Sequence, residues 1–311
     1  MCLNKPVAEI LMATYNGEKY LGEQIESILA QSDTRWHLTI SDDGSTDGTA
    51  KIIDEYAARY PERIVRYRSG IRFGNARDHF FHLMKVCDAP YMFFCDQDDV
   101  WYPQKIQVMM DEMLRAEAAH GKDMPVLVFS DQTPTDEQLR PLAQSLMRYQ
   151  QQYAEVIDYR AILMQNIVTG GAMVINKALA QLAGLCSDTA NVIMHDWWIA
   201  VVAARFGKVI YLDEALSAYR QHGDNSVGAK NVSSLAHIVD RMLHLGRLRN
   251  AIDAKKRQAA VFSKTYEQYL NREDRLFLQQ FIRSRSGMMF YWKNRVHVHD
   301  TFHLLGMIIL G

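Results

Sequence analysis

The chain has 311 residues, of which 48% are hydrophobic and 23% are charged, and its net charge is -1. This length and composition predict one large globular domain with an appendage, and we expect no nucleic-acid partner. Four cysteines without paired spacing exclude a disulfide framework and fit a reducing compartment. Because the amino terminus lacks a signal-peptide pattern and no stretch approaches the roughly 20 apolar residues of a membrane span, we expect a cytoplasmic protein.

The first part of the chain alternates short apolar segments with amphipathic ones, which predicts strands that alternate with helices. Strands are expected at 7–13, 36–41, 63–68, 91–95 and 125–130, and helices at 18–31, 47–60, around 80–84 and from Pro103 onward. The segment 91–95 is apolar throughout, which is typical of a strand buried on both faces. The alternation predicts a parallel, doubly wound sheet whose ligands bind at the carboxyl ends of the strands.

After Ser130 this alternation fades into a helical, Gln-rich stretch that ends near Gln165. A strand-like segment at 167–175 is interrupted by Gly170 and Gly171, and another strand is expected at 215–219. The chain shows no internal repeat.

Charge is distributed unevenly. From Ser234 onward there are 13 Lys and Arg against 6 Asp and Glu, whereas the preceding residues hold 22 against 30. The basic, aromatic segment at 283–295 could lie on an anionic membrane surface, or it could be an ordinary helical appendage with a solvated basic face. His297, His299 and His303 show metal-like spacing, but positions two apart on a helix point to different sides, so we expect no metal there.

Three carboxylates follow the apolar strand directly, at Asp96, Asp98 and Asp99. Side chains alternate along a strand, so Asp96 and Asp98 would leave it on the same side. At about 4 Å their repulsion is on the order of 4 kcal/mol at an effective dielectric near 20, which a bound divalent cation would reverse. All-oxygen ligation predicts Mg²⁺ or Mn²⁺.

Several common sites are excluded by their missing motifs. The chain has no Walker-type phosphate loop and no G-x-G-x-x-G after the first strand. It also has no C-x-x-C, H-E-x-x-H or G-x-S-x-G, so zinc hydrolysis and serine-nucleophile chemistry have no motif to support them.

Five motifs occur in order over roughly residues 6–228, and together they resemble those of the family 2 glycosyltransferases of the GT-A fold, in particular the bacterial rhamnosyltransferase-like branch. They are Ala13-Thr14-Tyr15-Asn16-Gly17, the segment from Ser41 to Thr49, the run from Cys95 to Trp101, His195-Asp196-Trp197-Trp198, and Tyr219-Arg220-Gln221-His222-Gly223. The resemblance implies an α/β, doubly wound, mostly parallel sheet flanked by helices. It implies a transferase domain over 1–232, with a nucleotide-binding part at 1–130 and an acceptor-side part at 131–232, followed by a helical region at 233–311.

The resemblance also implies a site for a nucleoside diphosphate sugar. Thr14, Tyr15 and Asn16 would flank the base and ribose, and Asp42 would accept a hydrogen bond from N3–H of uracil or thymine, with Asp43 as the less favoured candidate. The segment Asp42 to Ser45 could equally be a plain turn that feeds a helix cap.

The segment Asp96-Gln97-Asp98 corresponds to the family's D-x-D motif. Asp98 would bind the metal, and Asp96 would reach the ribose or the waters of the metal. For Asp99 we favour a cap of the helix near Pro103 over a contact with sugar hydroxyls. Arg220 and His222 could reach the donor phosphates, His222 could instead ligate the metal, and a surface-loop contact is the alternative for both.

The resemblance also implies that Asp196, which matches the family's acceptor-facing carboxylate, is the general base of an inverting, single-displacement transfer. Trp197 and Trp198 could form a wall against a sugar, although core packing of at least one is favoured. Thr169, Gly170 and Gly171 resemble the small-residue strand that approaches the acceptor, with a bulge as the alternative. One departure lies at Asp78, near which the family commonly has Asn, and this leaves the donor open.

The expected donor is a dTDP- or UDP-sugar, with rhamnose as the first choice, and the expected acceptor is a glycan or a lipid-linked sugar of a cell-surface polysaccharide. The processive Q-x-x-R-W motif is absent, which favours the addition of one or a few sugars. The alternatives are a hexosyl or N-acetylhexosaminyl transferase of the same family, an inactive relative that acts as a scaffold, and a sugar nucleotidyltransferase.

Overall fold

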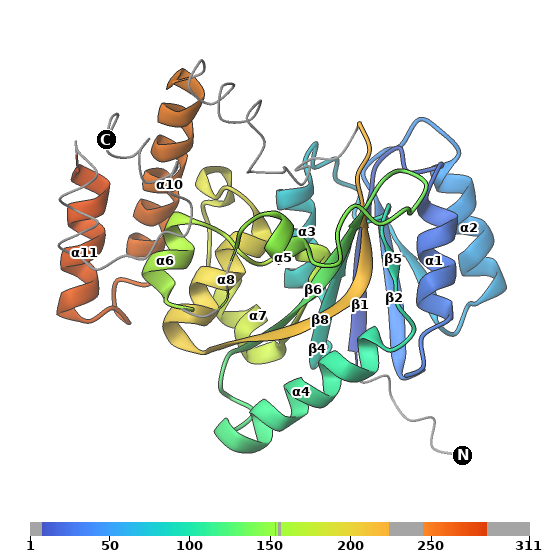
Figure 1. Cartoon of the computed structure of the whole chain (residues 1–311), viewed down its shortest axis with the longest axis horizontal. Helices are drawn as coiled ribbons and strands as arrows, with labels where there is room; N and C mark the ends of the chain where they lie inside the picture. The colour runs from blue at the N-terminus through green and yellow to red at the C-terminus, as the bar shows by residue number, and fades with distance from the viewer. Residues whose placement is uncertain (1–7, 153, 155–156, 224–244, 285–311) are drawn as a thin grey trace.

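The computed structural model describes residues 8–152, 154, 157–223 and 245–284, which form one eight-stranded sheet with helices on both faces (Figure 1). The strands are β1 (Ala8–Thr14), β2 (Trp36–Asp42), β3 (Ile64–Tyr67), β4 (Tyr91–Cys95), β5 (Val100–Trp101), β6 (Val126–Thr135), β7 (Met173–Asn176) and β8 (Lys208–Arg220). Their order in the sheet is β3-β2-β1-β4-β7-β6-β8-β5.

The helices are α1 (Leu21–Leu29), α2 (Thr49–Arg59), α3 (Ala76–Val86), α4 (Lys105–His120), α5 (Leu146–Tyr149), α6 (Tyr159–Met164), α7 (Lys177–Ala183), α8 (His195–Phe206), α10 (Leu245–Thr265) and α11 (Arg272–Arg283), with short 3₁₀ turns η1 (Gly170–Ala172) and η2 (Thr189–Asn191). The strands and helices predicted before Ser130 are all present. One start was wrong: α4 begins at Lys105, two residues after Pro103.

The sheet is mostly parallel, as predicted. β1 pairs in parallel with β2 and β4, β2 with β3, and β6 with β8, whereas β7 runs antiparallel to both β4 and β6, and β5 runs antiparallel to β8. The segment predicted as an interrupted strand at 167–175 is instead the 3₁₀ turn η1 followed by the short strand β7. The antiparallel β7 places Gly170 and Gly171 near the carboxyl end of β4, where the acidic run begins.

Two hydrophobic cores cover the two faces of the sheet. One contains Phe93 together with apolar residues of α1, α2 and α4. The other contains Met92 and Phe94 together with apolar residues of α3, α7 and α8. Since neighbouring residues of β4 face opposite cores and all are buried, the continuous apolar strand is explained by burial on both faces.

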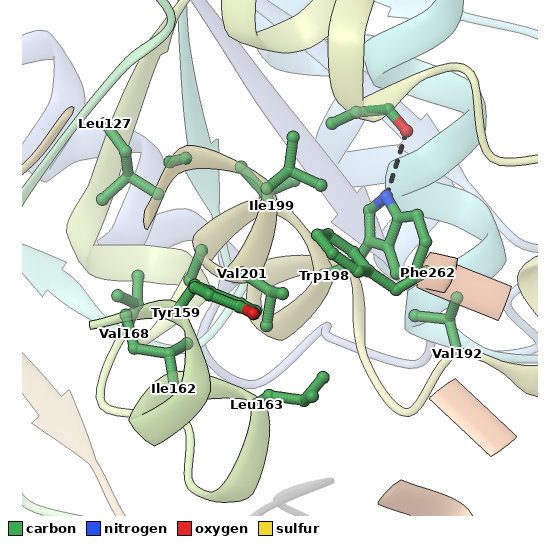
Figure 2. Close-up of a cluster of buried hydrophobic side chains, with 14 of the residues drawn as sticks. Leu127, Tyr159, Ile162, Leu163, Val168, Val192, Trp198, Ile199, Val201 and Phe262 are labelled. Carbon is green, nitrogen blue, oxygen red and sulfur yellow. Dashed lines mark hydrogen bonds between the residues drawn. The ribbon is translucent and has the colours of Figure 1, made fainter. Parts of the chain in front are cut away.

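The helices α10 and α11 complete the second core. Phe262 of α10 packs against Trp198 of α8 (Figure 2), with ring centroids 5.9 Å apart. Phe277 and Phe281 of α11 belong to the same cluster. The described part of the C-terminal region is thus helical and shares the core of the sheet. The predicted boundary at 232 and 233, the basic aromatic end and the three histidines lie outside the described residues. Within the described residues, no helix has the length and apolarity needed to cross a bilayer.

Candidate active site

The carboxyl ends of β1, β2 and β4 meet at one edge of the sheet. Because β1 lies between β2 and β4 in parallel register, Thr14 pairs with Asp42, and Cys95, the last residue of β4, pairs with Met12. The loops after these strands therefore adjoin one another, as the sequence predicts for motifs at the ends of parallel strands.

Asp42 anchors the loop after β2. One carboxylate oxygen accepts a hydrogen bond from the Thr14 hydroxyl at 3.0 Å, and the other accepts from the main-chain N–H of Ser45 at 3.0 Å. Asn16, which has a φ of 47°, joins the same network, since its N–H donates to the Ser45 hydroxyl at 2.8 Å. Tyr15 stands beside them with 48% of its surface exposed. The hydrogen bond from Ser45 to Asp42 closes this loop, but no side chain caps the following helix α2, whose N-cap residue is Gly48. Tyr15 offers an accessible aromatic face beside the loop.

Asp43 serves a different purpose. Its two carboxylate oxygens accept main-chain N–H groups of Phe73 and Gly74 at 2.6 and 2.7 Å, and the residue is buried. It holds the loop before α3 against the end of β2. Asp78 in the first turn of α3 pairs with Arg77, which lowers the pKa of Asp78 to about 2.

The acidic run places its carboxylates in three different surroundings. Asp98 faces the His222 ring, with Oδ2 2.7 Å from Nε2. Burial, followed by the charges of Asp98 and Asp196, raises the pKa of Asp96 to about 7. Burial also raises the pKa of Asp99 well above its ordinary value, and Asp98 and Asp96 add to this effect. Burial is the larger cause of both shifts, and the repulsion between these carboxylates is the part that a bound cation would relieve.

The residue types fit a hard divalent cation. The described part of the chain has no group of three His, Cys, Asp or Glu side chains already arranged around one point. A Mg²⁺ ion at a diphosphate site, however, takes one or two carboxylates from the protein and completes its shell with phosphate oxygens and water. Asp98 and Asp96, with His222 beside Asp98, match that partial donor set.

The prediction that Asp99 caps a helix is wrong. Asp99 is 1% exposed, and its Oδ1 accepts the main-chain N–H of Arg220 at 3.2 Å. The helix α4 has Gln104 at its N-cap position, and no side chain caps it. The reason is that Asp99 lies next to β8, whose backbone supplies a closer donor than the helix does.

Gly170 and Gly171 connect the acidic run to the predicted base. The N–H of Gly170 donates to Asp196 Oδ2 at 3.1 Å, and the main chain of Gly171 lies against the carboxylates of Asp96 and Asp99. A methyl group on Gly171 would lie 3.0 Å from Oδ2 of both Asp96 and Asp99. This glycine therefore allows main chain to pass between carboxylates, which explains the small residues at this position.

Asp196 lies in the first turn of α8, where the helix dipole favours an anion. Its Oδ1 accepts the Trp197 N–H at 2.6 Å. Burial nevertheless raises the pKa of Asp196 to about 7. The adjacent His195 is 4% exposed, and burial lowers its pKa to about 3, so it is a neutral ring against Phe80 at 4.3 Å.

Of the two tryptophans, Trp198 is a core residue, as favoured, with its ring N–H donating to Ala183 O at 3.1 Å (Figure 2). Trp197 is partly buried, and its ring N–H donates to Ile162 O. Its contact with a sugar stays a prediction.

Arg220 is 3% exposed, and protein groups surround its guanidinium. It donates to Asp98 O at 2.8 Å and to Glu137 O at 2.7 Å, and it forms an ion pair with Glu23. These contacts fix the main chain of the acidic run to the end of β8. The predicted contact with donor phosphates stays a prediction.

Sequence reasoning missed Lys105 and Gln97. Lys105 is fully buried under the acidic run, and Gln97 bonds to the loop after β1. A signal existed for Lys105, because it shares an i, i+4 stripe with the apolar Met109 and Met113, where a lysine is out of place. No comparable signal exists for Gln97.

Comparisons with known proteins identify the family of the chain. The family model described as Glycosyl transferase family 2 matches residues 9–182. The dTDP-rhamnosyl transferase RfbG of Shigella flexneri is 29% identical over 304 residues, which cover 96% of this chain and 99% of RfbG.

Solved structures share the fold. The crystal structure of S. aureus TarS 1–349 in complex with UDP aligns over 88% of this chain and 86% of TarS, with a TM-score of 0.53 and 15% identity. The mannosyltransferase PcManGT from Pyrobaculum calidifontis, solved with GDP-Man and Mn²⁺, aligns over 98% of this chain and 86% of its own, with a TM-score of 0.53 and 13% identity. The chain, with the five motifs of the rhamnosyltransferase-like branch on a GT-A fold, belongs to glycosyltransferase family 2.

Proposed function

We propose that the protein is an inverting, metal-dependent glycosyltransferase that moves a sugar from a nucleoside diphosphate donor to a glycan or lipid-linked acceptor of a cell-surface polysaccharide. One observation carries the proposal. The N–H of Gly170 bonds to Asp196, and the next residue, Gly171, lies against the carboxylate of Asp96, so the predicted base and the predicted diphosphate site adjoin one short turn.

The donor would bind across the ends of β1, β2 and β4. Tyr15 supplies an exposed aromatic face for the base, and Thr14 and Asn16 lie beside the ribose position. Asp42 is fixed by Thr14 and Ser45, and it is the acceptor that we assign to N3–H of the base. Both aspartates accept hydrogen bonds on both oxygens, but Asp43 is buried whereas Asp42 is partly exposed, which supports the preference for Asp42.

Asp98 would hold Mg²⁺ or Mn²⁺, with Asp96 and His222 as further candidate ligands, and the ion would neutralise charge that develops on the departing diphosphate. Arg220 fixes the main chain at Asp98 through a 2.8 Å hydrogen bond. This bond holds the main chain that carries the carboxylates. The site is therefore preorganised, and its groups need to move less during transfer.

Asp196 would act as the general base. The acceptor hydroxyl oxygen forms its bond to the anomeric carbon on the face opposite the diphosphate, the bond from that carbon to the diphosphate oxygen breaks, and the hydroxyl proton passes to Asp196. A base with a pKa of about 7 is well matched to this task near neutral pH. One displacement inverts the anomeric configuration.

Similarity to RfbG over nearly the whole chain supports dTDP-rhamnose as the donor. A hexosyl or N-acetylhexosaminyl donor is the alternative, because Asp78 departs from the family pattern near the donor. The site is expected to work at the cytoplasmic face of the membrane, where the basic C-terminal region would contact anionic lipid.

The test is a thermal-shift panel of nucleotide sugars with Mn²⁺, followed by transfer and donor-hydrolysis assays on variants. Asp98→Asn should lose the metal-dependent gain in nucleotide affinity. Asp196→Asn should keep that affinity and lose transfer by roughly 10²- to 10⁴-fold. The exposed Asp123→Asn is the matched control. Equal loss of donor affinity in both variants, or no stabilisation by any nucleotide sugar and no turnover, would contradict the proposal, and the latter would favour a scaffold.

A further inference from the structure

Gln97 lies between the two aspartates of the D-x-D segment, but its side chain points to the loop after β1. Its amide oxygen accepts the main-chain N–H of Tyr15 at 2.9 Å, and its amide nitrogen donates to the carbonyl oxygen of Tyr15 at 3.0 Å. One side chain thus satisfies the donor and the acceptor of one residue, as a neighbouring strand would.

Gly17 makes room for this contact. A methyl group on Gly17 would lie 2.3 Å from the amide oxygen of Gln97 and 2.6 Å from its amide carbon, which is far inside van der Waals contact. The Gly17 N–H donates to the Thr49 hydroxyl at 2.7 Å, so its main chain is held in place and cannot easily withdraw. The requirement for glycine here comes from space and not from an unusual φ, since Gly17 has no positive φ.

The clamped residue belongs to the nucleoside loop. Asn16 follows Tyr15 and bonds to the Ser45 hydroxyl at 2.8 Å, and the Ser45 N–H bonds to Asp42 at 3.0 Å. Gln97 therefore connects the acidic run to the chain of contacts that ends at Asp42.

We propose that Gln97 is a positioning residue for the donor nucleoside, which it serves by holding Tyr15 in the orientation that receives the base. The inference rests on the proposed function. Gln97 occupies the variable position of the D-x-D segment. The inference places its role at the nucleoside base of the donor, whereas the two aspartates would act at the metal.

The first experiment measures binding of uridine, thymidine, UDP and dTDP to the full chain, with and without Mn²⁺, by calorimetry or competition. For the nucleoside and the diphosphate that bind wild type, Gln97→Ala should lower both affinities by the same factor, about tenfold for two lost hydrogen bonds. Mn²⁺ should not change that factor. In transfer assays the donor KM should rise by a similar factor, while kcat stays within about threefold.

Two results would overturn the inference. One is unchanged affinity of Gln97→Ala for nucleoside and diphosphate. The other is a loss confined to the diphosphate in the presence of Mn²⁺, because this would place the effect of Gln97 at the metal. If wild type itself binds neither nucleosides nor diphosphates, the proposed function fails instead, so the two failures are distinguishable.

A double-mutant cycle provides the second experiment. Gly17→Ala should displace the amide of Gln97 and weaken nucleoside binding by about the same factor as Gln97→Ala. In the double variant the methyl group added at Gly17 meets no Gln97 amide. The total loss of nucleoside affinity should therefore stay within about threefold of the loss in either single variant. A total loss equal to the product of the two, about a hundredfold, would show that the residues act separately and would overturn the inference.

The matched control is Gly22→Ala in α1, where a methyl group would meet only the Tyr56 hydroxyl at an ordinary 3.9 Å. This variant should bind like wild type. Thermal unfolding of each variant without ligand checks that Gln97→Ala and Gly17→Ala are folded.

Discussion

The ammonium group of Lys105 donates a 2.5 Å hydrogen bond to the carbonyl oxygen of Gly171, under the acidic run. The side chain is fully buried, and burial lowers the pKa of Lys105 to about 8, although the neighbouring carboxyl groups of Asp99 and Asp96 oppose this effect. The main chain of Gly171 thus lies between this buried cation, which its carbonyl binds, and the carboxylates of Asp96 and Asp99. The cation offsets part of the charge that crowds the site.

Replacing Lys105 with Met should lower the free energy of unfolding by about 3 kcal/mol, because a buried cation is removed while the carboxylates near it remain. Urea denaturation at pH 7 measures this. Lys51→Met, at an exposed position on α2, is the control and should stay within about 0.5 kcal/mol of wild type. Equal urea midpoints for Lys105→Met and Lys51→Met would show that Lys105 does not balance the charge of the nearby carboxylates.

The transfer rate should rise with pH through about 7, where Asp196 loses its proton and becomes able to accept one from the acceptor hydroxyl. The kcat profile between pH 5.5 and 8.5, at saturating donor and acceptor, measures this. A kcat that is flat across this range, with chemistry shown to limit the rate, would argue against Asp196 as the base.

Stability provides an independent check of the same carboxyl group. Since its pKa is raised in the folded state, the folded protein holds this proton between the ordinary carboxyl pKa and about 7, whereas the unfolded chain releases it. The contribution of Asp196 to stability therefore falls as pH rises through this window. Asp196→Asn should stabilise the protein relative to wild type more at pH 8 than at pH 5, as measured by thermal unfolding.

Gly171→Ala should reduce transfer by between about tenfold and a hundredfold while the protein remains folded, because the methyl group would press on Oδ2 of Asp96 and Asp99 and displace the site. Steady-state transfer assays and unfolding curves together measure this. Gly22→Ala in α1 is the control, since a methyl group there meets only the Tyr56 hydroxyl at an ordinary 3.9 Å. Full activity of Gly171→Ala would mean that the carboxylates tolerate displacement.

Phe262→Ala should cost about 4 kcal/mol and should destabilise the whole domain in one transition, because this α10 ring is fully buried against Trp198 and Tyr266. Circular dichroism during urea denaturation measures the transition. Leu276→Ala, at an exposed position on α11, should cost less than about 1 kcal/mol. A separate, early transition in Phe262→Ala would show that the C-terminal helices fold apart from the sheet.

Local patterns were sufficient for the elements of the first part of the chain. The continuous apolar run at 91–95 predicted a strand buried on both faces, and β4 is one. Alternation of strands and helices predicted a parallel sheet with the motifs at the carboxyl ends of its strands, and β1, β2 and β4 do pair in parallel, which puts Asp42 and Asp98 at one edge.

Local patterns failed where the partner is distant. Asp99 was assigned to a helix cap because the nearest helix follows it, but its hydrogen bond comes from the main chain of Arg220, 121 positions away. The contact of Lys105 with Gly171 spans 66 positions, and that of Gln97 with Tyr15 spans 82.

The sequence by itself determined the periodicity of the elements, the edge at which the motifs gather and the family of the chain, because these depend on short segments and on residue type. Only the tertiary structure decided which carboxylate faces His222 and which carboxylate is buried against β8. It also decided which main-chain groups of Gly171 and Tyr15 bind side chains. Burial and hydrogen-bond pairing depend on residues that folding brings together from distant parts of the chain, and no spacing along the sequence encodes them.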